Sequence, residues 1–202
     1  MSVDDVLATK MIADPLHVAD CCLVTDAAGA LILSSTPCSP SAAVEPVRVA
    51  GWGQAHEHIT ATVSRDLASS VAGTSALHAL RMSELALADV DLLQLYDALT
   101  SQVIILLEDI GFCGKGEGGE FVSSGILGPK GGLPMNTPGG ALSYTHPGMF
   151  GIFTLIEAYR QLSNRYFGLE RAIEGRRTAL RHAIMGYAGG SHASVVLTKG
   201  AV

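Results

Sequence analysis

A histidine follows a glycine-rich loop in the second half of the chain. Residues 131–148 read Gly-Gly-Leu-Pro-Met-Asn-Thr-Pro-Gly-Gly-Ala-Leu-Ser-Tyr-Thr-His-Pro-Gly, with His146 near the end. Gly139 and Gly140 allow backbone to pass close to a ligand, and Pro147 suits the first turn of a helix. Near neutral pH an imidazole serves as a base and as a hydrogen-bond donor. The pattern predicts a catalytic histidine at a helix start; the alternative is a structural histidine there.

The segment after this histidine must position it, and its composition predicts a helix over 146–162. Over residues 149–158 only Thr154 and Glu157 are polar. A helix that is apolar all round is buried all round, whereas a single sheet-and-helix domain leaves one side in water. Three such side chains left exposed would each forfeit ~1.5 to 3 kcal/mol, against a typical net stability of ~5 to 15 kcal/mol. We therefore expect a partner to cover this helix; the alternative is a fragment that aggregates.

The rest of the chain alternates apolar patterns of helical and strand period. Residues 35–45, rich in Ser, Pro and Ala, predict a surface loop, and 112–132 predict a glycine-rich loop with room for a short helix. We expect helices over 4–12, 69–85 and 101–110, and strands over 23–25, 30–34, 47–53, 90–95, 178–185 and 194–198. This order predicts one α/β domain over residues 1–202, with a mixed sheet of about five strands covered by helices on both faces.

Composition excludes several classes of partner. Hydrophobic residues make up 48% of the chain and charged residues 16%, which is ample for a core. A formal charge of -6 argues against nucleic-acid binding, because a polyanion requires clustered Lys and Arg. No apolar run approaches the ~20 residues of a membrane span, and residues 1–5 lack the basic start of a signal peptide. We expect a cytoplasmic protein with no membrane span.

The residues around His146 resemble the thiolase superfamily, whose C-terminal half carries a Gly-Gly segment running into a histidine motif. Residues 95–100 and 106–121 resemble the lipid-transfer, or sterol-carrier, branch of that superfamily. Residues 186–197 resemble its closing glycine-rich turn, and 20–33 resemble the strand pair that opens its C-terminal half. The resemblance spans nearly the whole chain but only about half of a family member. It implies that the N-terminal half is absent and that the partner is a separate N-terminal half or a second copy of this chain.

The resemblance also implies a substrate and residue roles. Thiolases form or cleave a carbon–carbon bond beside a CoA thioester: one cysteine is acylated, a histidine activates it, and a second cysteine moves the α-proton. His146 matches the histidine, while the acylated cysteine belongs to the missing half. No cofactor is implied besides the CoA thioester substrate. The implied substrate-binding residues are Tyr96, Asn136, Gly139, Gly140, Gly189 and Gly190.

The sequence departs from thiolases where the second cysteine is expected. Tyr187 or His192 would have to move the proton there, and a tyrosine base needs its pKa of ~10 lowered; either residue could instead be structural. The sterol-carrier branch includes retro-aldolases of β-hydroxyacyl-CoA that lack the usual cysteines. Aldol cleavage therefore competes with thiolysis, and a noncatalytic assembly or acyl-CoA-binding subunit is a third possibility.

Tyr96 and Asp97 follow a predicted strand and precede a predicted helix, where many thiolases place an Asn or His beside the thioester. Asp97 is accordingly a candidate catalytic residue, and the alternative is an N-cap of the following helix.

Metal, disulfide and nucleotide sites receive little support from the sequence. The glycine-rich loop 114–119 lacks the P-loop pattern, and the His56–His58 pair has no evident third ligand. The cysteines have no C-x-x-C spacing and match no nucleophile motif: Cys21, Cys22, Cys38 and Cys113. We expect no bound metal.

Overall fold

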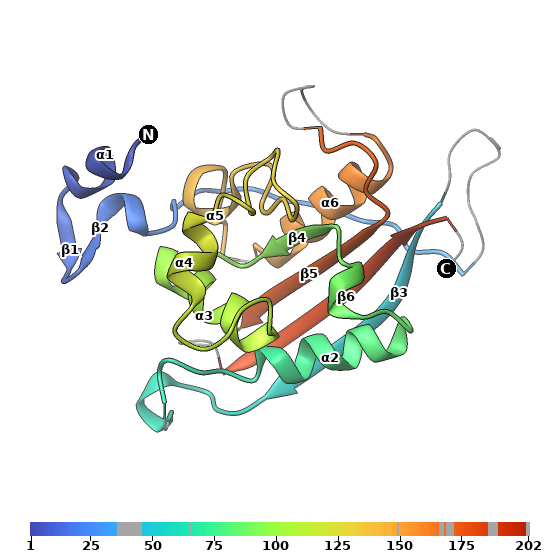
Figure 1. Cartoon of the computed structure of the whole chain (residues 1–202), viewed down its shortest axis with the longest axis horizontal. Helices are drawn as coiled ribbons and strands as arrows, with labels where there is room; N and C mark the ends of the chain where they lie inside the picture. The colour runs from blue at the N-terminus through green and yellow to red at the C-terminus, as the bar shows by residue number, and fades with distance from the viewer. Residues whose placement is uncertain are drawn as a thin grey trace.

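The computed structural model describes residues 1–35, 46–64, 66–148, 150–165, 168, 172–185 and 190–200. Its main sheet has four strands in the order β3-β6-β5-β4 (Figure 1). They are β3 (Val47–His56), β4 (Leu92–Leu95), β5 (Thr178–Met185) and β6 (Ser191–Lys199). β4 runs parallel to β5, and the other pairs are antiparallel. The predicted α/β class with a mixed sheet is confirmed.

Helices cover both faces of this sheet, as predicted (Figure 1). α2 (Ala72–Met82) and α3 (Thr100–Ile110) pack on one face, and α6 (Gly151–Leu162) packs on the other, over β4 and β5. The shorter helices are α1 (Val3–Leu7), α4 (Gly118–Ser123), α5 (Gly140–Ser143) and the 3-10 turns η1 (Val18–Asp20), η2 (Ala61–Val63) and η3 (Leu87–Asp89). A hairpin of β1 (Met11–Ala13) and β2 (Leu16–His17) forms a separate small sheet.

The period of the strands explains the two cores. Successive side chains of a strand point to opposite faces, so Leu180 of β5 joins the core under α2 and α3, while its neighbour Ala179 joins the core under α6. Gly51 and Gly53 of β3 let α2 lie close, because a Cβ at either position would meet the α2 backbone. The structure confirms the strands predicted over 47–53, 90–95, 178–185 and 194–198 and the helices predicted over 69–85 and 101–110, with ends that differ by up to three residues.

The strands expected over 23–25 and 30–34 are wrong, as is the helix expected to continue to residue 12. Residues 22–34 belong to no sheet. The amide of Cys22 donates to the carbonyl of Ala98 in the loop after β4, and the amide of Leu23 donates to the carbonyl of Ala141 in α5. This leaves the main sheet with four strands in the described ranges. The predicted loop 35–45 lies outside those ranges except for its first residue.

The helix predicted to begin at His146 begins at Gly151 instead. Gly148 has a φ of 74°, in the left-handed region that a right-handed helix cannot continue through. His146 therefore lies in the turn between α5 and α6. Within the described ranges, no helix combines the length and apolar character that crossing a membrane requires.

Candidate active site

The candidate site centres on a pair formed by Tyr96 and His146. Tyr96 follows β4, as the sequence predicted, and its hydroxyl lies 2.6 Å from Nε2 of His146. The two rings meet edge to face, with centroids 5.4 Å apart, and both pack on Phe150 just before α6. A half-buried tyrosine and histidine are thus held in direct contact although 50 residues separate them in the chain.

The backbone of His146 is fixed by the N-terminal segment. Its amide donates to Oγ1 of Thr25, and that oxygen lies 2.7 Å from Oγ1 of Thr145. Residues 22–34 therefore act as a strap over the turn that carries the histidine. The resemblance of residues 20–33 predicted that this segment belongs to the fold, but not this contact.

Burial sets the charge state of the pair. Burial lowers the pKa of His146, and it raises the pKa of Tyr96, with nearby Cys22 and Asp97 acting in the same direction. Both shifts favour the neutral forms. At neutral pH the pair is a neutral imidazole hydrogen-bonded to a protonated phenol.

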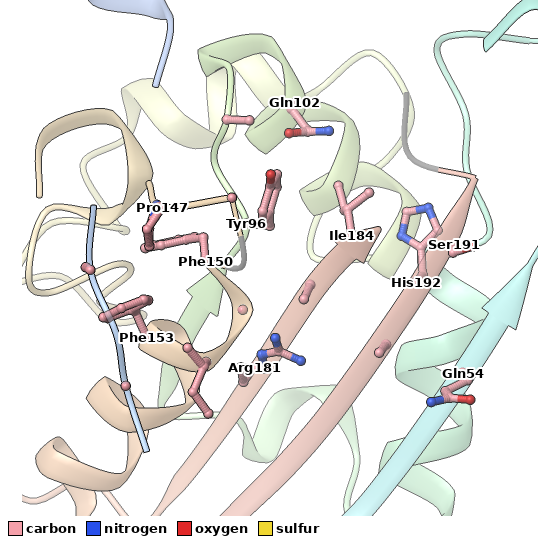
Figure 2. Close-up of a pocket in the computed structure, with 18 of the residues that line it drawn as sticks. Gln54, Tyr96, Gln102, Pro147, Phe150, Phe153, Arg181, Ile184, Ser191 and His192 are labelled. Atoms are coloured by element: carbon pink, nitrogen blue, oxygen red, sulfur yellow. The ribbon is translucent and has the colours of Figure 1, made fainter. Parts of the chain in front are cut away.

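A cavity of about 860 Å³ lies beside this pair (Figure 2). Tyr96, Pro147 and His192 line it, together with Arg181 of β5 and Gln54 of β3. Among the described residues, the lining does not include His146, which instead hydrogen-bonds to the cavity-lining residue Tyr96. This volume suits a small-molecule ligand, for which pockets of ~300 to 1,000 Å³ are usual.

The Gly139–Gly140 turn is built against Asp97. The backbone amide of Ala141 donates to Oδ1 of Asp97 at 2.7 Å, at the first turn of α5. Gly139 and Gly140 have φ of 109° and 63°, and a Cβ on Gly140 would overlap the Asp97 carboxylate. Asp97 does not cap the helix that follows it, whose N-cap is Leu99; it caps α5 across the fold.

Asn136, predicted to bind substrate, extends the edge of β4. Its side chain accepts from the amide of Leu95 at 2.9 Å and donates to the carbonyl of the same residue at 3.0 Å. Both polar atoms of its amide are thereby engaged with backbone. Asn136 thus anchors the glycine-rich loop to β4, the strand that precedes Tyr96.

Two polar residues of the cavity wall were not singled out from the sequence. Arg181 is largely buried, which lowers its pKa to about 10, and its Nε donates to Oγ1 of Thr154; in the described part of the chain it has no carboxylate partner. The buried Oε1 of Gln102 has no hydrogen-bond partner there either. The sequence signal that could have found Arg181 is a charged residue in the middle of the strand predicted over 178–185.

α6 buries three polar side chains together with Ala158 and Leu162, while several of its large apolar side chains remain partly exposed. Thr154, Glu157 and Gln161 are 2%, 6% and 1% exposed. Glu157 accepts hydrogen bonds from Thr137 and from Gln161 in a buried polar cluster that ties the glycine-rich loop to the helix. The large apolar side chains are only partly buried: Ile152, Phe153, Leu155, Ile156 and Tyr159. An ordinary surface helix keeps such polar residues on its solvent side, so α6 departs from that pattern at these three positions.

The model of the thiolase C-terminal domain-like family matches residues 53–199. The chain belongs to this family. It is 32% identical over 191 residues to an acetyl-CoA acetyltransferase of Methanothermobacter thermautotrophicus, a match that covers 94% of this chain and 49% of that protein. It is 34% identical over 169 residues to a 17-hydroxy-3-oxo-4-pregnene-20-carboxyl-CoA lyase of Mycobacterium tuberculosis, covering 80% and 43%.

The sterol-carrier resemblance is also confirmed. Sterol carrier protein 2 of Bos taurus is 28% identical over 197 residues, covering 91% of this chain and 35% of that protein. The solved structure of an Ltp2-ChsH2(DUF35) aldolase superposes with a TM-score of 0.83 at 23% identity, over 98% of this chain and 51% of that one. This thiolase-like domain thus spans about half the length of the curated relatives it matches.

The remaining predicted site residues of the thiolase-like domain lie in different places. His192 lines the same cavity as Tyr96, although it is itself only 2% exposed. Gly190 packs against the carbonyl of His58, where a Cβ would collide. Tyr187, Gly189 and Cys38 lie outside the described residues.

The nucleotide and metal sites considered from the sequence, loop 114–119 and the His56–His58 pair, contain interactions within the protein. In the glycine-rich loop 114–119, Nζ of Lys115 lies 2.6 Å from Oδ1 of Asp109, so the lysine forms a salt bridge within the protein. Nδ1 of His56 lies 3.0 Å from Oγ of Ser191. Among the described residues, no group of three or more potential metal ligands comes together.

Gly140→Ala is expected to destabilise the thiolase-like domain more than Gly148→Ala. Both positions have positive φ, which costs a non-glycine residue ~1 to 3 kcal/mol, but only at Gly140 would the new Cβ also meet a side chain, that of Asp97. Thermal unfolding of the two variants measures the difference. Equal melting temperatures would contradict the close packing of the loop on Asp97.

Asp97 is expected to make stability depend on pH. Burial raises its pKa to about 6, despite the hydrogen bonds that it accepts from backbone amides. Because the folded-state pKa lies above the ordinary value of ~3.9, the folded state binds this proton more tightly. The resulting stabilisation is full below pH ~4 and is lost as pH rises through about 6, at ~1.4 kcal/mol per unit of pKa shift.

Comparison of unfolding free energies for the native chain and Asp97→Asn between pH 4 and 7 isolates this contribution, because the other carboxylates are common to both. The native chain should lose stability relative to the variant as the pH rises. A difference that stays constant with pH would mean that Asp97 titrates normally.

Proposed function

We propose that this chain is the histidine-bearing half of an enzyme that forms or cleaves a carbon–carbon bond beside a CoA thioester. The observation that carries the proposal is the Tyr96–His146 hydrogen bond at the wall of a ligand-sized cavity. Membership of the thiolase C-terminal domain-like family and the acyl-CoA names of two relatives support it. We further propose a cytoplasmic location.

The pair suits stabilisation of a thioester enolate. Breaking a carbon–carbon bond beside the thioester places negative charge on its oxygen, and preorganised donors near that oxygen lower the barrier. Tyr96 lines the cavity, its raised pKa keeps its hydroxyl protonated, and the contact with His146 fixes the position of that hydroxyl. In this proposal Tyr96 donates to the developing oxyanion, and His146 serves as its proton relay.

The acylated cysteine of a thiolytic reaction would come from the partner. Burial raises the pKa of Cys22 and Cys113, whereas a nucleophilic thiol needs a lowered pKa. Cys21 is partly buried and matches no nucleophile motif. We therefore propose that the chain performs no thiolysis by itself.

Aldol cleavage of a β-hydroxyacyl-CoA is the second candidate, and the Tyr96–His146 contact favours it. Such a reaction needs a base for the hydroxyl and stabilisation of the enolate, and it needs no acylated cysteine. A lyase of a carboxyl-CoA and a steroid side-chain-cleaving aldolase are among the relatives.

The outer face of α6 supports the proposal of a partner. Its half-exposed apolar side chains adjoin the strap of residues 22–34, where Val24 and Ile32 are 98% and 94% exposed. Gly29 of the strap packs against Ile152 and Ile156. We propose that an N-terminal thiolase half, or alternatively a second copy of this chain, buries this joint apolar surface, which we call the α6–strap surface.

The reaction type is tested by supplying the assembled complex with two substrates. Acetoacetyl-CoA with free CoA reports thiolysis, and a β-hydroxyacyl-CoA reports aldol cleavage through release of an aldehyde or ketone. Intact-mass analysis after incubation shows which chain, if either, carries an acyl group. Acylation of a cysteine of this chain would overturn the assignment of the nucleophile to the partner.

A further inference from the structure

The cavity beside Tyr96 contains a positive charge that no described side chain balances. Arg181 of β5 lines this cavity, and Figure 2 shows its side chain among the other lining residues. Burial lowers the pKa of its guanidinium to about 10, so the group is a cation at neutral pH. None of the ion pairs among the described residues includes Arg181. Within the described part of the chain, this cation is therefore left without a counter-charge.

The hydrogen bond that Arg181 makes leaves one edge of its guanidinium free. Nε donates to Oγ1 of Thr154 at 3.0 Å, and the Thr154 hydroxyl donates its own hydrogen to the carbonyl of Gly151 at 2.8 Å. The two terminal nitrogens, Nη1 and Nη2, have no hydrogen-bond acceptor among the described residues. They present parallel N–H groups, and this fork matches the two oxygens of a carboxylate.

The start of α6 makes room for this fork. Gly151 is the first residue of the helix, and a Cβ at this position would overlap Nη2 of Arg181. The φ of Gly151 is not in the left-handed region, so the space, rather than the backbone conformation, requires a glycine. The first turn of a helix also carries partial positive charge. Both features favour an anion at this point of the cavity.

A buried cation without a partner is costly, because the protein interior does not replace the water that hydrates the charge. Buried charges in proteins are accordingly paired. The position of Arg181 is therefore unfavourable for the stability of the free chain, and an anionic group of a ligand in the cavity would supply the missing partner.

We propose that Arg181 is a specificity-determining residue that binds a carboxylate on the acyl group of the CoA thioester. This inference rests on the proposed function. The amide of Tyr96, the proposed oxyanion donor, bonds at 3.1 Å to the carbonyl of His182, which adjoins Arg181. The phosphates of CoA are separated from the thioester by the whole pantetheine arm, whereas a carboxylate on a short acyl chain stays beside it. The preferred substrates are therefore CoA thioesters of dicarboxylic acids.

A matched pair of thioesters tests this site on the assembled complex. Glutaryl-CoA and pentanoyl-CoA have acyl chains of equal length that end in a carboxylate and in a methyl group, and free CoA carries the phosphates alone. Isothermal titration should give a Kd for glutaryl-CoA at least about tenfold below that for pentanoyl-CoA. Arg181→Met should raise the Kd for glutaryl-CoA ~30-fold or more, with little change for pentanoyl-CoA or CoA.

This titration measures binding without turnover, which separates the inference from the proposed function. A complex that prefers glutaryl-CoA but cleaves no acyl-CoA would contradict the proposed function and leave the carboxylate site standing. Equal binding of the two thioesters, or binding of neither, would overturn the site. A loss of affinity for all three ligands in Arg181→Met, free CoA included, would assign Arg181 to a phosphate and would also overturn it.

Urea unfolding of the full chain without ligand separates a binding role of Arg181 from a structural one. Because methionine removes an unpaired buried charge, Arg181→Met should unfold at an equal or higher urea concentration than the native chain. A lower midpoint would identify Arg181 as a structural ion-pair residue and would overturn the proposal. Arg181→Lys keeps the charge but lacks the fork, so it should recover only part of the affinity for glutaryl-CoA. Full recovery by lysine would contradict binding through the fork.

Discussion

Replacement of His146 by alanine is expected to lower turnover of the assembled enzyme ~100- to 1,000-fold. One donor aimed at a developing oxyanion contributes ~3 to 4 kcal/mol, and loss of the imidazole frees the Tyr96 hydroxyl from its fixed position. The fold should persist, because the turn is held by the His146 backbone amide on Thr25, which alanine keeps. The measurement is kcat/KM of the complex, with the melting temperature of each variant as the check on folding.

Tyr96→Phe is the matched comparison for this prediction. It removes only the hydroxyl and keeps the ring contacts with Phe150. If the two residues act as one unit, the double variant should be little worse than either single variant. Near-native turnover of His146→Ala in a fully assembled complex would make the histidine structural and would remove the centre of the proposed mechanism.

Substitution of Ile32 by aspartate is expected to weaken association with the partner roughly 10- to 150-fold. Ile32 is 94% exposed in this chain, so the change should alter the stability of the chain alone by less than ~0.5 kcal/mol. Burial of one large aliphatic side chain contributes ~1.5 to 3 kcal/mol, and each 1.4 kcal/mol is about tenfold in Kd. Titration of the labelled chain with its partner measures the change.

Leu77→Asp is the control for this interface. Leu77 is also exposed, at 48%, but it lies on α2, on the opposite face of the sheet from α6. This variant should bind the partner as the native chain does. Equal weakening by both variants, or by neither, would place the partner away from the α6–strap surface.

Most of the correct fold predictions came from the local periodicity of apolar residues. β5 and the body of α3 were located to within one residue because each is mainly apolar and is bounded by glycine or polar residues. The apolar run of α6 was located as well, but its start was not, since sequence pattern does not reveal that Gly148 takes a positive φ. The strands predicted over 23–25 and 30–34 are wrong, and the amide of Leu23 bonds to the carbonyl of Ala141 in α5, a long-range contact that sequence pattern does not reveal.

The candidate site was predictable only where a motif was local. His146 and the Gly139–Gly140 turn stood out because glycines and a histidine cluster within a few residues. The contact of His146 with Tyr96, and that of Arg181 with Thr154, join distant or separate elements, and neither has a spacing rule. The burial of the polar residues of α6 was not predicted either, because the number of polar residues in a helix does not tell which of them face the core.

Turnover of an acyl-CoA substrate by one preparation of this chain, measured alone and after assembly with a partner half, tests the central claim most directly. We expect no turnover by the chain alone and clear turnover by the complex, with light scattering to measure the mass of each species. Turnover by the monomeric chain would contradict the claim that it is an incomplete site. A complex of the expected mass that turns over neither β-ketoacyl-CoA nor β-hydroxyacyl-CoA would contradict the claim that the Tyr96–His146 pair is catalytic.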